Sequence, residues 1–428
     1  MVPGGRSECM SGESSSSTGA EPAGPWRSAE RHRSGQDAPP LAGVRVLDLA
    51  TALAAPLAAG ILAEQGADVI KIEPPGAGDV LRHVGPAIGG VSGIYQMTNR
   101  SKRAATVDIT TAEGRAIVLE LAAGADLVLQ NFRPGVAERL GVSYEHLRQV
   151  NPDVIVVAVT GFGPTGPYAD RPAYDGIIQA ASGFAALEAD AETGEPHSLR
   201  HTVSDKLTAL YAVQAATAAL LARERGAGGQ LLEVAMLEVS ASFLWIDAAG
   251  RETLLDYDGP QRSDPAAHVK PMACADGWMY IVALSDDQYT GLCRALEVEV
   301  DDRLATMAGR HQNRGLARLV WREIRARLAA LGTAEACARL EAHDVPHSPA
   351  VAVGDLPAHP QLSRRDFFGD SVHPAAGRMR QTRPPVRFSG TPAVWQPHAP
   401  EPGRDTDEII AGLGGADAGA LRAAGVIS

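Results

Sequence analysis

Two aspartates stand where helices are expected to begin, and a carboxylate in such a place can either cap the helix or act on a substrate. Asp205 precedes an apolar, alanine-rich stretch at 206–225 that predicts a buried helix, which the glycines from Gly226 onward would close. Asp175 precedes a second expected helix that begins near Gly176. Backbone N–H groups and the positive end of a helix dipole favour the ionised form of these carboxylates near neutral pH. An ionised carboxylate can be a nucleophile, although the residue type alone is more typical of a cap.

Apolar strands with short helical connections must position these side chains. The expected strands lie at 44–49, 66–73, 126–131 and 154–159. The expected helices between them lie at 52–64, 113–123 and 144–150. Strands and helices that alternate over short links are typical of a parallel sheet with helical crossovers, and the last strand has no polar alternation, as in a sheet covered on both faces. The sequence therefore predicts an α/β fold with an open, doubly wound parallel sheet, which binds ligands beyond the carboxyl ends of its strands.

Three loops that follow the expected strands are candidates to border a ligand. The loop at 73–79 lacks the Gly-x-Gly-x-x-Gly spacing of a dinucleotide-binding fingerprint, so a nicotinamide cofactor is not expected. The loop at 131–135 follows the third strand. The loop at 160–167 is rich in glycine and proline, which lets the backbone approach a ligand closely but also suits an ordinary exit from a strand.

The composition of the sequence argues against several classes of protein. A formal net charge of -12 argues against nucleic acid as the main partner, because phosphate binding needs a basic surface. No apolar run approaches the roughly 18 residues of a membrane span. The cysteines are scattered without metal-ligand spacing, so free thiols in a reducing cytoplasm and no structural zinc are expected. Residues 1–40 are rich in Gly, Ser, Pro and Arg and are predicted to be disordered.

Short motifs in a fixed order, from Leu41 to the C-terminus, carry a resemblance to a known family. The motifs lie at 41–48, 66–73, 99–103, 131–135, 160–163, 174–175, 205, 228–230, 275–278, 343–346 and 388–389. With them the sequence resembles the class III CoA-transferases of the CaiB/BaiF type, which include formyl-CoA and crotonobetainyl-CoA/carnitine transferases and the related 2-methylacyl-CoA racemases. Each motif is weak by itself, but their common order makes the match specific at the level of the family.

The resemblance implies a covalent mechanism without a metal or a permanently bound cofactor, with coenzyme A esters as substrates. Transferases of this family use an aspartate at the position of Asp205. Its carboxylate attacks the thioester of an acyl-CoA donor, forms a mixed anhydride and becomes an aspartyl-CoA thioester, which an incoming carboxylic acid then attacks. A thioester carbonyl is a good electrophile for a carboxylate held against it.

Two other interpretations stay open at this point. In the racemases the carboxylate that corresponds to Asp175 removes and returns the proton next to the thioester, but the residue before it is typically His and here is Tyr174. His146 could supply a base if the fold brought it near, although its neighbours suit a surface helix. A non-catalytic CoA-binding relative is the third interpretation, because Leu53 replaces a glutamine of formyl-CoA transferase and that enzyme's glycine-rich lid is not visible at 256–270.

The resemblance also implies which residues bind CoA and how two subunits assemble. The expected CoA-binding residues are Lys102, Arg103, Asn131, Phe132, Arg139 and Tyr174. A lone cation is often only a solvated surface charge, so these positions are candidates. The expected domains are a large CoA-binding domain at 41–255, a smaller α+β domain at 256–370 and a return to the large domain at 371–428. Two subunits of the family thread through each other, so an interlocked homodimer is expected.

Overall fold

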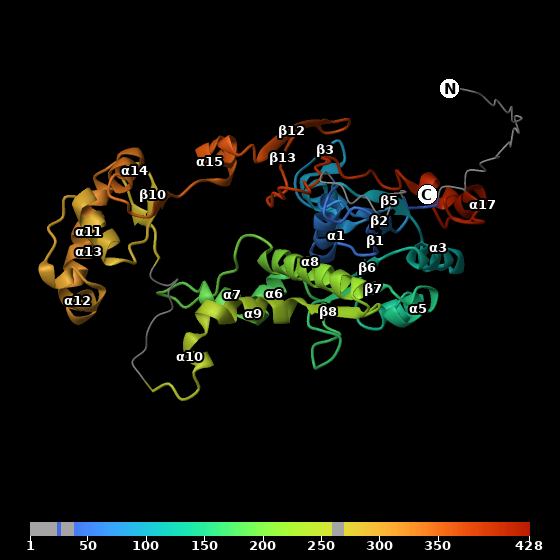
Figure 1. Ribbon diagram of the computed structural model, residues 1–428, viewed down its shortest axis with the longest axis horizontal. Coiled ribbons are helices and arrows are strands. Elements are labelled where there is room, and N and C mark those ends of the chain that lie inside the picture. The colour runs from blue at the N-terminus through green and yellow to red at the C-terminus, as the bar shows by residue number, and fades with distance from the viewer. Residues whose placement is uncertain (1–23, 27–37, 259–268) are drawn as a thin grey trace, which may run out of the picture. The chain divides into compact units, whose positions relative to one another are not determined.

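The computed structural model describes residues 24–26, 38–258 and 269–428, which form two compact units (Figure 1). The large unit comprises Met1–Gln179, Leu199–Val239 and Asp370–Ser428. The small unit comprises Ala180–Ser198 and Ser240–Gly369, so its main part begins before the polar loop that composition marks as the boundary. The predicted disorder at 1–23 and 27–37 lies outside the described residues.

Six parallel strands form the central sheet of the large unit, in the order β5-β2-β1-β6-β7-β8. Their bounds are β1 Arg45–Asp48, β2 Asp68–Glu73, β5 Arg103–Thr106, β6 Leu127–Gln130, β7 Ile155–Thr160 and β8 Leu231–Ala235. Strands β2 and β5 extend the sheet from β1 toward one edge, and strands β7 and β8 extend it from β6 toward the other. The expected open parallel sheet is therefore confirmed, and its topological switch point lies between β1 and β6.

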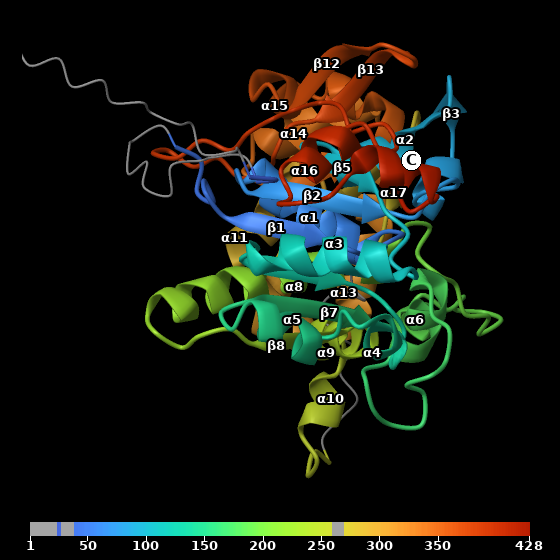
Figure 2. The ribbon, with the colours of Figure 1, turned by 90° about the vertical axis from the view of Figure 1, so that its right-hand side faces the viewer.

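Both faces of the sheet are covered by helices, which explains why central strands such as β7 show no polar alternation. Val46 and Leu129 join the core on one face, and Leu47 and Val128 join the core on the other. Helices α1 (Ala54–Glu64) and α8 (Val203–Glu224) pack on the first face, where their alanines allow a close approach. The second face is covered by α3 Ala112–Ala123, α5 Tyr144–Val150, α16 Thr406–Ala411 and α17 Ala418–Ala423 (Figure 2).

Shorter elements complete the large unit and lead to the small one. The helices are α2 Gly93–Asn99, α4 Val136–Leu140, α6 Asp175–Ser182 and α9 Met236–Ala248, with a 3-10 turn, η1, at Val80–His83. Two hairpins pair β3 Ala87–Ile88 with β4 Val91–Ser92, and β12 Phe368–His373 with β13 Gly377–Thr382. Within the described residues, no helix has the length and apolar character needed to cross a bilayer.

The small unit has its own hydrophobic core. Its antiparallel sheet has the order β11-β10-β9, with β9 Met272–Ala273, β10 Trp278–Ile281 and β11 His347–Pro349. Its helices are α7 Phe184–Leu187, α10 Gly250–Thr253, α11 Asp286–Ala295, α12 Met307–Gln312, α13 Arg314–Ala329, α14 Thr333–Glu341 and α15 Pro360–Arg364, with 3-10 turns η3 Asp302–Leu304 and η4 Val353–Ala358. Met279, Leu292 and Ile324 are fully buried in this core. Cys274, Cys293 and Cys337 are free thiols, as expected.

Segments from both ends of the chain close the second face of the large unit. Thr106 of the edge strand β5 bonds Ser428, since its hydroxyl donates to the Ser428 carbonyl oxygen at 2.6 Å. Near the N-terminus the structure differs from the expectation of disorder over all of 1–40. Trp26 is buried in the same core as Leu121 and Ile410, because its indole offers a large apolar surface that composition averaged over the segment hides.

Candidate active site

A cavity of about 370 Å³ lies at the carboxyl ends of β1, β6 and β7. Its walls include the segments that follow these strands, at 51–54, 131–134 and 160–161. The loop at 171–174, together with Asp205 and Met236, also lines this cavity. This is the switch point of the sheet, where open α/β folds bind their ligands.

Asp205 borders the cavity from the first turn of α8. The helix begins at Val203 with Thr202 as its N-cap, so Asp205 does not cap its own helix as the sequence suggested. Its carboxylate instead faces the backbone N–H of Ala54, the first residue of α1, and this donor lowers its pKa. The N-cap of α1 is Leu53, whose side chain cannot accept a hydrogen bond. Asp205 therefore serves as a cap for the neighbouring helix.

The pKa of Asp205 is raised from 3.8 to about 7, first by burial and second by the charge of Asp175. The Ala54 N–H and the Lys206 ammonium both lower the pKa but do not offset these two causes. From the sequence, a position at a helix start was expected to favour the ionised form near neutral pH. In the structure, burial and the charge of Asp175 outweigh this effect and raise the pKa. The residue pattern at a helix start carries no information on burial.

Asp175 lies behind Asp205 and not on the cavity wall. It is buried, with 7% of its surface exposed. Its Oδ1 accepts from the backbone N–H of Asp205 at 3.0 Å and its Oδ2 accepts from Nε2 of Gln179 at 2.5 Å. Gln179 is held in turn, since its Oε1 accepts from the N–H of Leu199 at 2.8 Å. Both expected catalytic aspartates are thus brought together, with Asp205 toward the cavity and Asp175 bonded within the protein.

The expected CoA-binding residues divide into two groups. Asn131, Phe132 and Tyr174 line the cavity, and Tyr174 is 76% exposed. Arg139 is exposed on α4.

Lys102 and Arg103 lie in the protein interior and bind protein groups. The Nζ of Lys102 donates to Asp48, Asn99 and the Pro56 carbonyl at 2.7 to 2.8 Å, and burial lowers the pKa of its ammonium to about 8. Arg103 pairs with Asp68 at 2.7 Å. The structure therefore places these two cations away from the cavity wall, since each uses its donors to hold buried segments together.

Two cavity cations were not among the candidates from sequence. Arg133 follows Phe132 at the end of β6, and Arg171 precedes Tyr174. The Arg171 guanidinium lies over the ring of Tyr168, 3.6 Å from its centroid, and Tyr168 packs edge-on against Phe162. Arg133 lies in a loop already singled out and Arg171 lies outside those loops, and a single sequence does not show which loop side chains turn toward a cavity.

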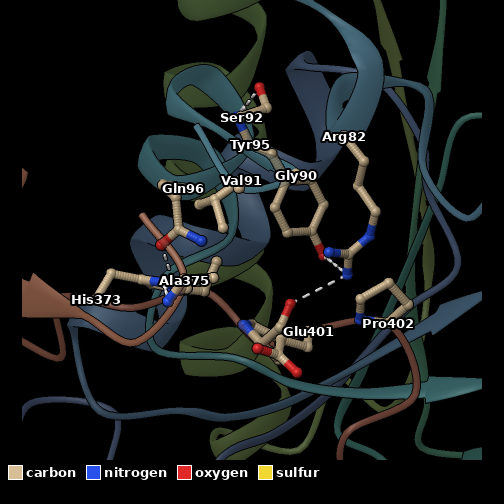
Figure 3. A pocket seen from close by; sticks show the side chains of 13 residues that line it. Arg82, Gly90, Val91, Ser92, Tyr95, Gln96, His373, Ala375, Glu401 and Pro402 are labelled. Carbon is tan, nitrogen blue, oxygen red and sulfur yellow. Dashed lines mark hydrogen bonds between the residues drawn. The ribbon is translucent and has the colours of Figure 1, made fainter. Parts of the chain in front are cut away.

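A second cavity of about 180 Å³ lies between α2, the β3–β4 hairpin and the C-terminal segment (Figure 3). Arg82 lies over the Tyr95 ring at 3.8 Å, and its Nη2 donates to the hydroxyl of Tyr95 and to the carbonyl of Pro400 (Figure 3). Gln96 accepts from the N–H of Ala399 at 2.9 Å. These side chains form their hydrogen bonds with other groups of the protein. The cavity therefore lies at the outer end of a network of buried polar groups.

His146, a candidate base from the sequence, has a definite place in the structure. His146 is half-buried on α5, where its Nδ1 lies 2.8 Å from the hydroxyl of Ser143, and it does not line the main cavity. Among the described residues there is also no cluster of three or more His, Cys, Asp or Glu side chains arranged to hold a metal ion.

The chain is similar to known proteins in sequence and in fold. Residues 41–406 match CoA-transferase family III. A succinate–glutarate CoA-transferase of Agrobacterium fabrum is 33% identical over 88% of this chain and 96% of its own length. A succinyl-CoA–D-citramalate CoA-transferase of Chloroflexus aurantiacus is 32% identical over 87% of this chain and 94% of its own. The crystal structure of a CaiB/BaiF family protein from Brucella suis superposes with a TM-score of 0.76 at 32% identity, covering 88% of this chain and all of that one.

The family match spans most of the chain, and these relatives cover it from the large unit through the small unit and back. The chain belongs to CoA-transferase family III.

Proposed function

We propose that this chain moves CoA from an acyl-CoA donor to a carboxylic acid, with Asp205 as the covalent nucleophile. The observation that carries the proposal is the carboxylate of Asp205, which borders the cavity at the switch point and has a pKa raised to about 7. A carboxylate with this pKa is more basic than an exposed one and is still ionised in about half of the molecules at neutral pH.

The transfer proceeds in four balanced steps. The Asp205 carboxylate adds to the thioester carbonyl, the C–S bond breaks, and a mixed acyl anhydride and CoA thiolate result. The thiolate attacks the aspartyl carbonyl of that anhydride and releases the donor acid as a carboxylate. The acceptor carboxylate then attacks the aspartyl-CoA thioester and expels the thiolate, which finally attacks the acceptor's acyl carbon and restores Asp205. Each step exchanges one acyl bond for another, so no redox partner is needed.

The N–H of Ala54 has two roles in these steps. It donates to the carboxylate before reaction and so favours the ionised nucleophile. When the aspartyl carbonyl is attacked, negative charge develops on the oxygen that this N–H faces. A fixed backbone donor at that oxygen stabilises the tetrahedral intermediate without reorganisation.

Dicarboxylic acids are the substrates that we propose. The two relatives above are named for succinate, glutarate and citramalate, which each carry a second carboxylate. Arg133 and Arg171 line the same cavity, and Arg171 is supported by the Tyr168 ring. A guanidinium held in one orientation suits bidentate binding of a planar carboxylate. The pyrophosphate of CoA is the competing ligand for either arginine.

The experiment is to incubate the protein with a panel of acyl-CoA esters, trap the enzyme with hydroxylamine or borohydride, and locate the modification by peptide mass spectrometry. An adduct on Asp205 that Asp205→Asn abolishes is the expected result. Transfer that survives in Asp205→Asn without any adduct would show that another group is the nucleophile.

The same panel separates transfer from racemisation. A racemase would carry solvent deuterium into the carbon next to the thioester, with Asp175 as the base. Asp175 has both oxygens bonded within the protein and does not line the cavity, whereas Asp205 does. We therefore expect no deuterium exchange that depends on Asp175.

We also propose that two copies interlock as a homodimer. The chain leaves the large unit at Ala180 and again at Ser240, and it returns at Leu199 and at Asp370. A chain with such excursions can pass through a second copy. Light scattering with size-exclusion chromatography measures the mass directly, and a monomer at micromolar concentration would contradict this assembly.

A further inference from the structure

The segment 50–53, which connects β1 to α1, has its backbone held almost entirely by side chains. The N–H of Ala50 donates to Oδ1 of Asp48 at 3.0 Å, and the carbonyl of Ala50 accepts from Nζ of Lys71 at 2.7 Å. The side chain of Asn131 accepts from the N–H of Thr51 at 3.0 Å and donates to its carbonyl at 2.7 Å. Side chains hold irregular backbone in this way where a definite conformation is required.

Ala52 is the residue at which this segment turns. Its φ is 63°, in the left-handed region that a residue with a Cβ atom rarely occupies. Its N–H donates to Oδ1 of Asp79 at 3.2 Å. A non-glycine residue remains in this region only when its surroundings fix it there. Ala54 follows two residues later with the N–H that faces Asp205.

Asp79 itself is held rigidly. It is fully buried, its Oδ1 also accepts from the N–H of Leu81 at 2.9 Å, and its Oδ2 lies 2.9 Å from Nζ of Lys71. Its own N–H donates to Oε2 of Glu73 at 2.8 Å. Glu73 accepts hydrogen bonds from Arg82, and Arg82 borders the second cavity (Figure 3). A continuous polar network therefore runs from that cavity to Ala52.

We propose that Asp79 is a positioning residue for CoA transfer: it holds Ala52 in the left-handed conformation and thereby aims the N–H of Ala54 at the carboxylate of Asp205. This inference rests on the proposed function, because it assigns the Ala54 N–H a part in the reaction of Asp205. Asp79 touches no substrate, since it is buried behind the 50–53 segment and does not line the cavity.

The groups that face Asp205 come from three helices. They are Asp175 from α6, Lys206 from α8 and the Ala54 N–H from α1. If the Ala54 N–H turns away, one of the two groups that favour the ionised carboxylate is lost. The pKa of Asp205 then rises, and the oxyanion that forms during transfer loses a donor. A loss of stability alone would change neither quantity in the folded enzyme.

The test compares Asp79→Ala with Asp79→Asn. Both variants remove the charge that faces Lys71, but only asparagine keeps an Oδ1 that can accept from Ala52 and Leu81. For Asp79→Ala we expect kcat to fall about 10- to 100-fold, with a smaller change in KM. In the pH profile of kcat/KM, the acid limb reports the pKa of Asp205 in the free enzyme. We expect this limb to move to higher pH by about half a unit or more. Asp79→Asn should lose about fivefold less kcat than Asp79→Ala and keep the acid limb near that of the parent.

Glu64→Gln is the control for the loss of a buried ion pair elsewhere on α1. Glu64 accepts from Arg100 at 2.6 Å near the C-terminal end of the helix, away from the 50–53 segment. It should lower thermal stability and leave the acid limb in place. If Asp79→Ala does not fold, Lys71→Met combined with Asp79→Leu removes the ion pair, the contact of Asp79 with Ala52 and the bond from Lys71 to the Ala50 carbonyl, while keeping apolar volume. That double variant should show the same fall in kcat.

Two results would overturn the inference. One is a folded Asp79→Ala variant, or the folded double variant, with the parent's kcat and acid limb. The other is an equal loss in Asp79→Ala and Asp79→Asn, which would assign the effect to the ion pair and not to the contact with Ala52. Failure of the proposed function is distinct, because the parent enzyme itself would then form no adduct on Asp205.

Discussion

The carboxylate of Asp205 faces a backbone N–H at the start of α1 and lies in the first turn of α8, and its pKa is nevertheless raised. A helix dipole contributes about 0.3–1 kcal/mol to a nearby charge, whereas taking a carboxylate out of water costs several kcal/mol. The second, like charge of Asp175 adds to that cost. The proposed nucleophile is thus kept in its basic form at some expense to the stability of the fold, as is common where activity needs a strained site.

This balance predicts the pH dependence of stability. The pKa of Asp205 is 3.8 before burial and about 7 in the folded protein, so the folded state holds this proton more tightly. Its ionisation therefore lowers stability as the pH rises from about 4 through 7, by at most about 4 kcal/mol. Asp205→Asn, which mimics the protonated form, should be more stable than the parent by about 2–4 kcal/mol at pH 8 and nearly equal at pH 4. Urea unfolding at both pH values measures this difference.

Glu224→Gln is the control on the same helix, because Glu224 is exposed at its far end. It should change stability by less than about 0.5 kcal/mol at either pH. An Asp205→Asn variant that gains nothing at pH 8 would show that the carboxylate is ionised without cost.

Asp175 should set the pH at which the enzyme becomes active. Asp175→Asn removes the like charge next to Asp205, so the pKa of Asp205 should fall and the acid limb of kcat/KM should move downward by about half a pH unit or more. The N–H of Asp205 keeps an acceptor in this variant, because the new side chain offers an amide oxygen. An unchanged acid limb, or an upward shift, would contradict the coupling of the two aspartates. The measurement is a pH profile with one saturating acceptor acid.

At the scale of elements, the strands and helices of the large unit could be predicted because their hydrophobic patterns are strong. Strands such as β7 are apolar on both faces, and helical links between them leave few other topologies. The relation between the elements could not be predicted from one sequence. Nothing in the residues around Leu53 indicates that α1 lacks a cap of its own and takes one from α8. The role of Asp79 is hidden for the same reason, because its partner Ala52 is fixed by the folded network.

A single glycine sets the distance between two loops of the cavity. A Cβ atom on Gly161, directly after β7, would lie 2.3 Å from the Cβ of Ala173. Such an overlap must push the 171–174 loop, and Tyr174 with it, away from β7. Gly161→Ala should therefore lower kcat/KM for the acyl-CoA by about 10-fold or more. Steady-state kinetics with one donor measure this loss.

Gly176→Ala is the matched control, since Gly176 lies in α6 and a Cβ atom added there would meet no other atom within 4 Å. It should keep the parent's kinetics and add about 0.4–1 kcal/mol of stability, because alanine loses less chain entropy than glycine in a helix. Kinetics of Gly161→Ala that equal those of Gly176→Ala would show that the 171–174 loop moves without consequence.

At the scale of the whole chain, the two ends close one face of the large unit. Trp26 is 6% exposed and packs in the core that also holds Ile410 and Val426. Gly124 and Gly412 leave the space for it, since a Cβ atom on either would come within 2.8 Å of Trp26 or Pro25. Arg103 completes the contact, because its Nη2 donates to the carbonyl of Pro25 at 2.9 Å. Residues far apart in sequence thus seal the core beneath the β5 edge of the sheet.

Trp26→Ala should therefore lower the free energy of unfolding by about 3–5 kcal/mol, the usual cost of removing a buried aromatic side chain. Trp26→Phe keeps most of the apolar volume and removes an indole N–H that has no hydrogen-bond partner among the described residues, so it should cost less than about 1.5 kcal/mol. Both are measured by urea unfolding at pH 7. Equal stability of Trp26→Ala and the parent would mean that the large unit closes without its N-terminal segment. Because this segment lies across the sheet from α1 and α8, the kcat of folded Trp26→Ala should match the parent, which separates the closure of the core from the chemistry at Asp205.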